Sequence, residues 1–244
     1  IREKVERLGL DIPVEVEWKK YEGDDRLWLA DIEPLGLELP VEEMQEMMRH
    51  AMKEAPPEEA LERFENVLKH DPECRTEYGK AAQIMVGVNL MRLGKLEEAE
   101  EAIKIGLNLF PEEDRNMWKL KGYEALGHIY HERNELEEAL DIYQMSIELY
   151  APDEFGEREV DIYQLVTHHK AIRIKMGEIY IQTGQKDQAY EILKSVFKFE
   201  MMIPRLDARA HLLLGELQME EGHLELAKAE FQAVLDIAEK PEAE

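Results

Sequence analysis

Residues 87–111 have the sequence GVNLMRLGKLEEAEEAIKIGLNLFP. Three later stretches, beginning at Gly127, Gly177 and Gly215, align with it without gaps, and each has an alanine twelve residues after its glycine. An earlier segment fits the same register with Met48 and Ala60. The alanines of the five units are Ala60, Ala99, Ala139, Ala189 and Ala227. A unit of about 39 residues, with one longer step after Ala139, therefore repeats along the chain, which is typical of stacked helical hairpins.

Each unit is predicted to contain two helices. Apolar side chains recur at intervals of three and four residues, as on one face of a helix. In the second unit these are Leu96, Ala99, Ile103 and Leu107. Between the two helices stands a glycine or asparagine, which suits the left-handed conformation that often ends a helix. These turn residues are Gly94, Asn134, Gly184 and Gly222.

A large side chain follows each alanine by four positions. These residues are Phe64, Ile103, Tyr143, Leu193 and Phe231. With Tyr130 and Tyr180 in the first helices, the pattern resembles the tetratricopeptide repeat (TPR). The resemblance implies an all-α, TPR-like solenoid of helical hairpins wound as a right-handed superhelix. The units are longer than the usual repeat of that family, which implies extended helices or turns.

The repeats divide the chain into segments. We expect residues 1–40 to form an N-terminal extension, and residues 241–244 to be a tail. The five repeats are expected at about 41–73, 76–113, 115–152, 159–201 and 204–240. In the extension we predict a small helix over residues 1–8 and a β-hairpin, because Val14, Val16 and Trp18 alternate with polar residues before a Gly23-Asp24 turn. The insertion at residues 151–160 predicts a lengthened first helix in the fourth unit.

The composition limits the classes of function. The 244 residues are 44% hydrophobic, which is enough for a packed array, and they carry a formal charge of −25. Such an acidic surface disfavours nucleic-acid binding. No apolar run approaches the roughly 18 residues of a membrane-spanning helix, so no membrane segment is predicted. A single cysteine, Cys74, fits a reducing compartment, and a cytoplasmic location is therefore predicted.

Signatures of enzyme chemistry are missing from the sequence. It has no phosphate-binding loop, no paired C-x-x-C and no H-E-x-x-H. Ser146 and Ser195 lack the surroundings of a nucleophile, and a hydrolase is disfavoured for that reason. Cys74, in the polar turn DPECRTE, is expected to be an inert surface thiol. We predict no catalytic residue and no cofactor.

A metal site is a minor alternative in the third unit. His128 and Glu132 are separated by one helical turn and could chelate a metal, with His131 and Glu124 on the same face. No cysteine or second histidine pair completes a set of four ligands. A polar wall of a binding groove is therefore the favoured interpretation, and no metal is predicted.

The resemblance implies that the first helix of each unit lines a concave surface where a peptide binds. The expected lining residues are Arg49, Ile84, Val88, Met91, Arg92, Lys121, Glu124, His128, His131, Glu132, Ile174, Glu178, Ile181, Gln182, Leu212, Glu216, Met219 and Glu220. The charge of this lining runs from basic in the first two units to acidic in the last two, so a bound segment should be acidic toward the first units. Arg49, Val88 and His128 stand where relatives that capture a C-terminal carboxylate have asparagines, so that mode is disfavoured.

These patterns favour a non-enzymatic adaptor or scaffold that binds a protein or peptide partner. The alternative is a sensory or regulatory TPR segment of a larger transcription or signalling protein, which an adjoining domain in the gene would reveal. In the last helix, Phe231, Val234 and Leu235 are expected to point inward. A second stripe, Ala229, Ala233 and Ile237, is predicted to contact another subunit of a homo-oligomer or a continuation of the chain.

Overall fold

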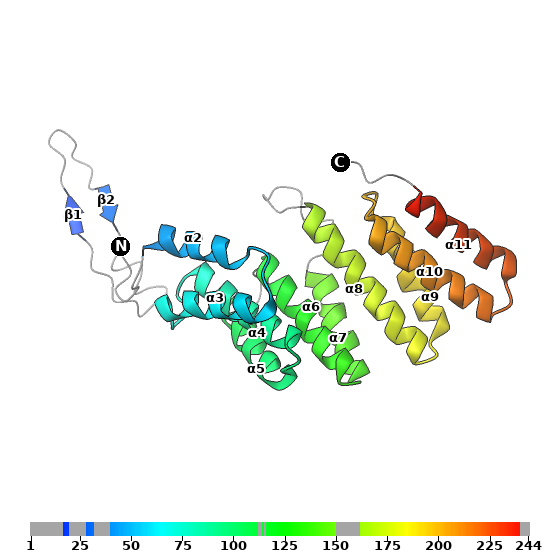
Figure 1. Ribbon diagram of the computed structural model, residues 1–244, viewed down its shortest axis with the longest axis horizontal. Helices are drawn as coiled ribbons and strands as arrows, with labels where there is room; N and C mark the ends of the chain where they lie inside the picture. Colours follow the sequence, from blue (N-terminus) through cyan, green and yellow to red (C-terminus); the bar gives the residue numbers. More distant parts are fainter. Residues whose placement is uncertain are drawn as a thin grey trace.

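The computed structural model describes residues 17–19, 28–31, 40–111, 114, 116–149 and 162–239. Within these ranges the chain is a row of helical hairpins, from α2 at one end to α11 at the other (Figure 1). The helices are α2 (Val41–Ala51), α3 (Pro57–His70), α4 (Glu77–Arg92), α5 (Leu96–Asn108), α6 (Met117–Glu132), α7 (Leu136–Leu149), α8 (Ile162–Gln182), α9 (Lys186–Ser195), α10 (Pro204–Glu220) and α11 (Leu224–Ala238), with a 3-10 turn, η2 (Val196–Lys198), after α9.

The hairpins stack in the order of the sequence. Each odd-numbered helix packs on the even-numbered helix before it, and the even-numbered helices also contact one another in the series α2, α4, α6, α8 and α10. Contacts therefore join only neighbouring hairpins. This is the arrangement of a helical solenoid, in which each unit covers the apolar face of the next.

Four hairpins turn at the predicted residues. The backbone φ angles are 77° at Gly94, 61° at Asn134, 74° at Gly184 and 81° at Gly222, all in the left-handed region. In this conformation the residue after the turn donates its N–H back into the last turn of the first helix, as Glu135 does to the Tyr130 carbonyl at 2.9 Å. The predicted positions of the turns are confirmed.

Close packing of the two helices in a hairpin rests on the repeated glycine. A Cβ atom placed on Gly127 would lie 2.4 Å from Cε1 of Tyr143, and one on Gly215 would lie 2.5 Å from Cε1 of Phe231. The large side chain four residues after each alanine thus occupies the space that a side chain on the glycine would need. Tyr143 is fully buried as a result.

Buried polar groups hold the connections between hairpins, a feature that the sequence analysis did not predict. Asp71 accepts hydrogen bonds from the backbone N–H of Arg75 at 2.8 Å and of Thr76 at 2.9 Å. Lys119 donates to the Pro111 carbonyl at 2.8 Å. These groups satisfy backbone donors and acceptors at helix ends that would otherwise be unpaired.

A buried ion pair joins the last two hairpins. Nζ of Lys170 in α8 lies 2.6 Å from Oδ1 of Asp207 in α10, and the side chains are almost completely buried. The other Asp207 oxygen accepts the backbone N–H of Ile203 at 2.6 Å, just before α10 begins. One carboxylate therefore both orients the start of α10 and binds α8.

The fourth hairpin has a long first helix, as predicted: α8 has 21 residues, whereas α4 and α6 have 16 each. In the N-terminal extension, β1 (Glu17–Lys19) and β2 (Trp28–Asp31) pair in antiparallel fashion, with Trp18 opposite Leu29. The predicted helix at 1–8, the Gly23-Asp24 turn and the insertion at 151–160 lie outside the described residues. The β-hairpin as a whole therefore stays a prediction.

Substituting Gly127 by leucine should destabilise the array, because the new side chain and Tyr143 cannot share one space. We expect a loss of about 1–3 kcal/mol in the free energy of unfolding, measured by urea denaturation. The control is Glu101→Leu on the exposed side of α5, which should change the free energy by less than about 0.5 kcal/mol. Equal stability of the two variants would contradict the packing described.

The turn at Asn134 allows a second test. At φ 61°, alanine has the steric penalty of a Cβ but lacks the amide group whose local hydrogen bonds let asparagine adopt this conformation. Asn134→Ala should therefore lower the free energy of unfolding by about 1 kcal/mol. Asn134→Gly removes the steric penalty of the left-handed conformation and should be neutral within about 0.5 kcal/mol. Thermal unfolding of both variants against the wild type gives the comparison, and an alanine variant as stable as the glycine variant would count against a left-handed turn here.

Candidate functional site

The even-numbered helices lie side by side, and most of the predicted lining residues on them are accessible. Seven of these side chains are exposed: Arg49, Arg92, Glu132, Gln182, Glu216, Met219 and Glu220. Nine are half-buried: Val88, Met91, Lys121, Glu124, His128, His131, Glu178, Ile181 and Leu212. We name the accessible residues of α4, α6, α8 and α10 the inner face.

The prediction is wrong for two of the lining residues, Ile84 and Ile174. Ile84 is completely buried, and its Cγ1 lies 2.6 Å from the position that a Cβ on Gly106 of α5 would take. Ile174 is buried in the apolar cluster between α8 and α10. Both isoleucines point toward the neighbouring helices because bulky apolar side chains at this position of the repeat fill the inter-helix space, so neither can touch a ligand.

The residues next in sequence take their place on the inner face. Met85 and Lys175 are half-buried one position after Ile84 and Ile174, and the sequence analysis missed them. For Lys175 a signal was available, since Lys175, Glu178 and Gln182 recur at three and four residues as a polar stripe. Met85 has no such signal, because it stands among apolar neighbours.

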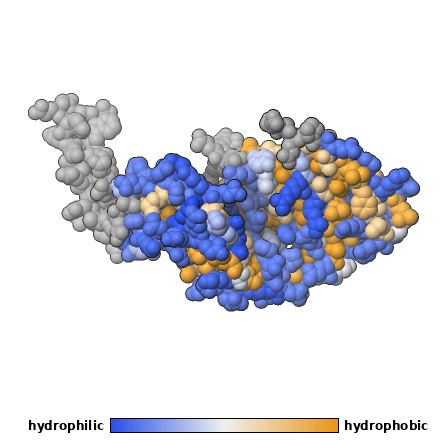
Figure 2. Space-filling model, viewed as in Figure 1, coloured by the Kyte–Doolittle hydropathy of each residue, from blue (hydrophilic) through white to orange (hydrophobic). Residues whose placement is uncertain are grey.

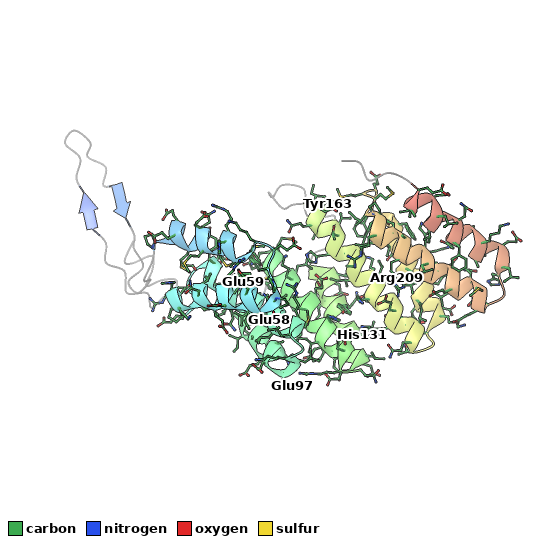
Figure 3. All side chains as sticks on the ribbon, in the orientation of Figure 1. Glu58, Glu59, Glu97, His131, Tyr163 and Arg209 are labelled. Atoms are coloured by element: carbon green, nitrogen blue, oxygen red, sulfur yellow. The ribbon has the colours of Figure 1, made fainter. Side chains whose placement is uncertain are left out.

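Ion pairs link the inner face from helix to helix. Glu124 of α6 pairs with His168 of α8. Glu178 of α8 accepts hydrogen bonds from Arg209 of α10 at 2.8 Å and from Lys175 at 3.0 Å, and Figure 3 shows Arg209 on α10 beside α8. Burial alone would raise the pKa of Glu178, but the hydrogen bonds from the two cations outweigh it and lower the pKa.

These pairs alter the predicted charge gradient. Glu178 is neutralised by Arg209 and Lys175, and Glu220 lies 2.9 Å from Nζ of Lys186. The α8 and α10 part of the inner face is therefore less acidic than the count of lining residues predicts. At the other end, the guanidinium of Arg92 donates a hydrogen bond to the side-chain oxygen of Asn89.

Free positive charge remains on α4 and α6. In the part of the chain that the structure describes, no carboxylate lies within ion-pair distance of Arg92, and Nζ of Lys121 lies 6.0 Å above the ring of Trp118 without an ion pair. Beside them, Met85, Val88 and Met91 give α4 a half-exposed apolar strip. This half of the inner face thus combines apolar contact with unpaired cations.

His128 and His131 of α6 are both half-buried at the centre of the inner face. Burial lowers the pKa of His128, and the positive charge of Lys175 lowers it further, against the opposing effect of Glu132. His128 Nδ1 lies 3.9 Å from Glu132, too far for a hydrogen bond. Among the described residues, no three His, Cys, Asp or Glu side chains converge in a way that could hold a metal ion.

The expected exposure of Cys74 is wrong. The thiol is buried, and burial together with the charge of Asp71 raises its pKa to about 11. The sulfur therefore stays protonated at neutral pH, and a protonated thiol is a poor nucleophile. The position in a polar turn was misleading because the turn packs against the start of α4, where a Cβ on Gly79 would lie 3.0 Å from the Cα of Cys74.

The last helix also differs from the prediction. Leu235 was expected to point inward but is 56% exposed, while Phe231 and Val234 are half-buried. The stripe predicted to contact another subunit, Ala229, Ala233 and Ile237, lies on the same flank as Leu226, which borders a hollow shared with Tyr190 of α9. A subunit contact through this stripe stays a prediction.

Comparisons with known proteins agree with this architecture. Tetratricopeptide repeat models match residues 123–157, 173–198 and 208–241. Among curated protein sequences there is no significant match. Among the described residues, no helix is long and apolar enough to cross a membrane.

Several solved structures share the fold. A crystal structure of MamA is 21% identical over 75% of this chain and 89% of its own, with a TM-score of 0.54. MamA 41-end from Desulfovibrio magneticus RS-1 is 14% identical over 83% and 97%, with a TM-score of 0.57. The nearly identical TPR-like repeats of a protein from Podosopora anserina, named as a kinesin light chain, are 16% identical over 83% and 97%, with a TM-score of 0.58.

The repeated glycine and alanine, the left-handed turns, the stacked hairpins and the three matching repeat models lead to one conclusion. The chain is a tetratricopeptide repeat protein.

Proposed function

We propose that the chain is a non-enzymatic scaffold that binds a segment of a partner protein along its inner face. The observation that carries the proposal is the half-exposed apolar strip of Met85, Val88 and Met91 beside the unpaired cations Arg92 and Lys121. Partner segments that dock on helical surfaces use apolar anchors for affinity and charged residues for orientation. The fold shared with MamA and with the kinesin light chain repeats supports a role in protein interaction.

The segment that fits this surface has apolar anchors for α4 and one or more acidic residues for Arg92 and Lys121. It needs few basic residues for α8 and α10, because Glu178 and Glu220 already have cationic partners, and Glu216 is the acidic lining residue there with no ion pair among the described residues. The expectation that a bound segment is acidic toward the first units is kept, while the pairing on α8 and α10 weakens the attraction of that end for basic residues. Orientation of the segment then depends mainly on the positive charges of Arg92 and Lys121.

A displayed random-peptide library selected on the whole chain gives a direct test. Met91→Asp should weaken binding of the selected peptides by about tenfold or more, since a charge replaces an apolar contact at the end of the strip next to Arg92. The matched control is Ile105→Asp on α5, where the side chain is 49% exposed and remote from the inner face. Ile84→Asp is unsuitable as a test, because it would place a charge in the core.

Peptides that bind Met91→Asp and the wild type equally, and lose affinity for Ile105→Asp, would place the site elsewhere.

The absence of catalysis has its own test. Turnover in a general esterase and phosphatase screen, abolished by a single substitution, would contradict a purely binding role.

The charged zone should act mainly on association. Arg92→Glu is expected to slow binding of an acidic selected peptide at low salt, with little change in dissociation, because exposed charges steer the encounter. The difference should shrink at physiological ionic strength, where charges are screened over about 8 Å. Stopped-flow association rates at two salt concentrations measure it. An effect confined to dissociation, or independent of salt, would argue against steering by Arg92.

A further inference from the structure

The end of the array at α11 exposes side chains that are covered in the other hairpins. Leu107, eight residues after the alanine of the second unit, is 9% exposed because it packs on Gly122 of the following helix α6. Leu235 holds the same position after Ala227 and is 56% exposed. Leu224, which corresponds to the half-buried Leu96, is 65% exposed. We name Leu224, Phe231 and Leu235 the stacking face.

Phe231 fits the same pattern. Its counterparts Phe64, Ile103, Tyr143 and Leu193 are all buried, whereas Phe231 is half-buried. The space-filling view shows hydrophobic residues gathered over this C-terminal end and mostly hydrophilic residues over the α2 and α3 end (Figure 2). Polar capping helices usually close a solenoid, and α11 is not one. The stacking face thus corresponds to an inter-hairpin interface, and no following hairpin covers it among the described residues.

The α2–α3 end of a second copy is a poor partner for the stacking face. The side of the first hairpin that a preceding unit would occupy is a hollow between α2 and α3 lined mainly by charged and polar side chains, among them Glu43, Glu62, Arg63 and Lys69. If leucine and phenylalanine packed against these side chains, the charged groups would lose their hydration without gaining hydrogen-bond partners, which costs free energy. Head-to-tail stacking of copies would also build a larger ring or an open filament, whereas contact between two identical faces closes as a dimer.

Among the charged residues of α11, the cation Lys228 and the anion Asp236 come close to each other across such a dimer. Leu224, Lys228, Phe231 and Leu235 recur at three and four residues and lie on one face. If two α11 helices run antiparallel about an axis between Phe231 and Gln232, Lys228 of each copy lies beside Leu235 and within one helical turn of Asp236 of the other copy. Within the described residues Lys228 has no ion pair, and Asp236 accepts only the amide of Gln232 at 2.8 Å.

We propose that the chain forms a two-fold dimer in which the stacking faces of two copies pack together through antiparallel α11 helices. The apolar side chains form the centre, and a Lys228–Asp236 pair closes each end. The inner face stays open on both copies, so the dimer presents two binding surfaces. A partner with two docking segments then binds more tightly than either segment alone, because the second contact is intramolecular.

Sedimentation equilibrium of the whole chain over a wide concentration range tests the dimer. The wild type should show a monomer–dimer equilibrium, and Leu235→Lys should raise the dimer dissociation constant by about tenfold or more. Because Leu235 is already exposed in the single chain, this variant should fold, which circular dichroism checks. The matched control is Ile105→Lys, 49% exposed on α5, which should leave the equilibrium unchanged.

Charge exchange tests the antiparallel arrangement. Lys228→Asp and Asp236→Lys should each weaken the dimer, and the two together should restore it, since the pairs re-form with reversed sign. A wild type that stays monomeric at every concentration overturns the proposal, as does a dimer that Leu235→Lys leaves intact. A double variant as weak as the single ones overturns the antiparallel α11 contact. None of these outcomes depends on peptide binding to the inner face.

Discussion

The structure depends on the contact between a glycine in the first helix of a hairpin and a large side chain in the second. Gly127 and Tyr143 illustrate it: the ring lies where a Cβ would otherwise stand, and both residues are buried. The contact brings the two helix axes close together and leaves the remaining apolar side chains directed toward the next hairpin. Stacking follows, because a single hairpin cannot bury both of its apolar faces.

This constraint also determines where a ligand can bind. Side chains that point between hairpins are buried in the stacking interfaces and cannot contact a ligand, as is the case for Ile84 and Ile174. What remains accessible on the first helices is a narrow strip set by the helical repeat, and neighbouring strips are joined by ion pairs such as Glu178 with Arg209. The charges available for recognition are those left unpaired among the described residues, chiefly Arg92 and Lys121 on α4 and α6 and Glu216 on α10, rather than the sum over the chain.

Much of the fold could be predicted from the sequence because its determinants are local. A residue with φ above zero between two helices is nearly always glycine or asparagine, so Asn134 and the three turn glycines marked the hairpins. The site was less predictable, since a shift of one residue rotates a side chain by about 100° and separates the buried Ile174 from the accessible Lys175. Burial of Cys74 and exposure of Leu235 depend on which hairpin lies next to them, which no local pattern records.

The buried pair of Lys170 and Asp207 has a consequence for folding fidelity. The hairpins are alike enough that, during folding, one could dock on the wrong neighbour with acceptable apolar contact. Any arrangement that does not bring α8 against α10 leaves a buried lysine or a buried aspartate without its counter-charge, which costs several kcal/mol, on the order of 3–5. The pair therefore favours docking of the last hairpin on α8 over docking on any other hairpin. It selects the correct order of units that otherwise resemble one another.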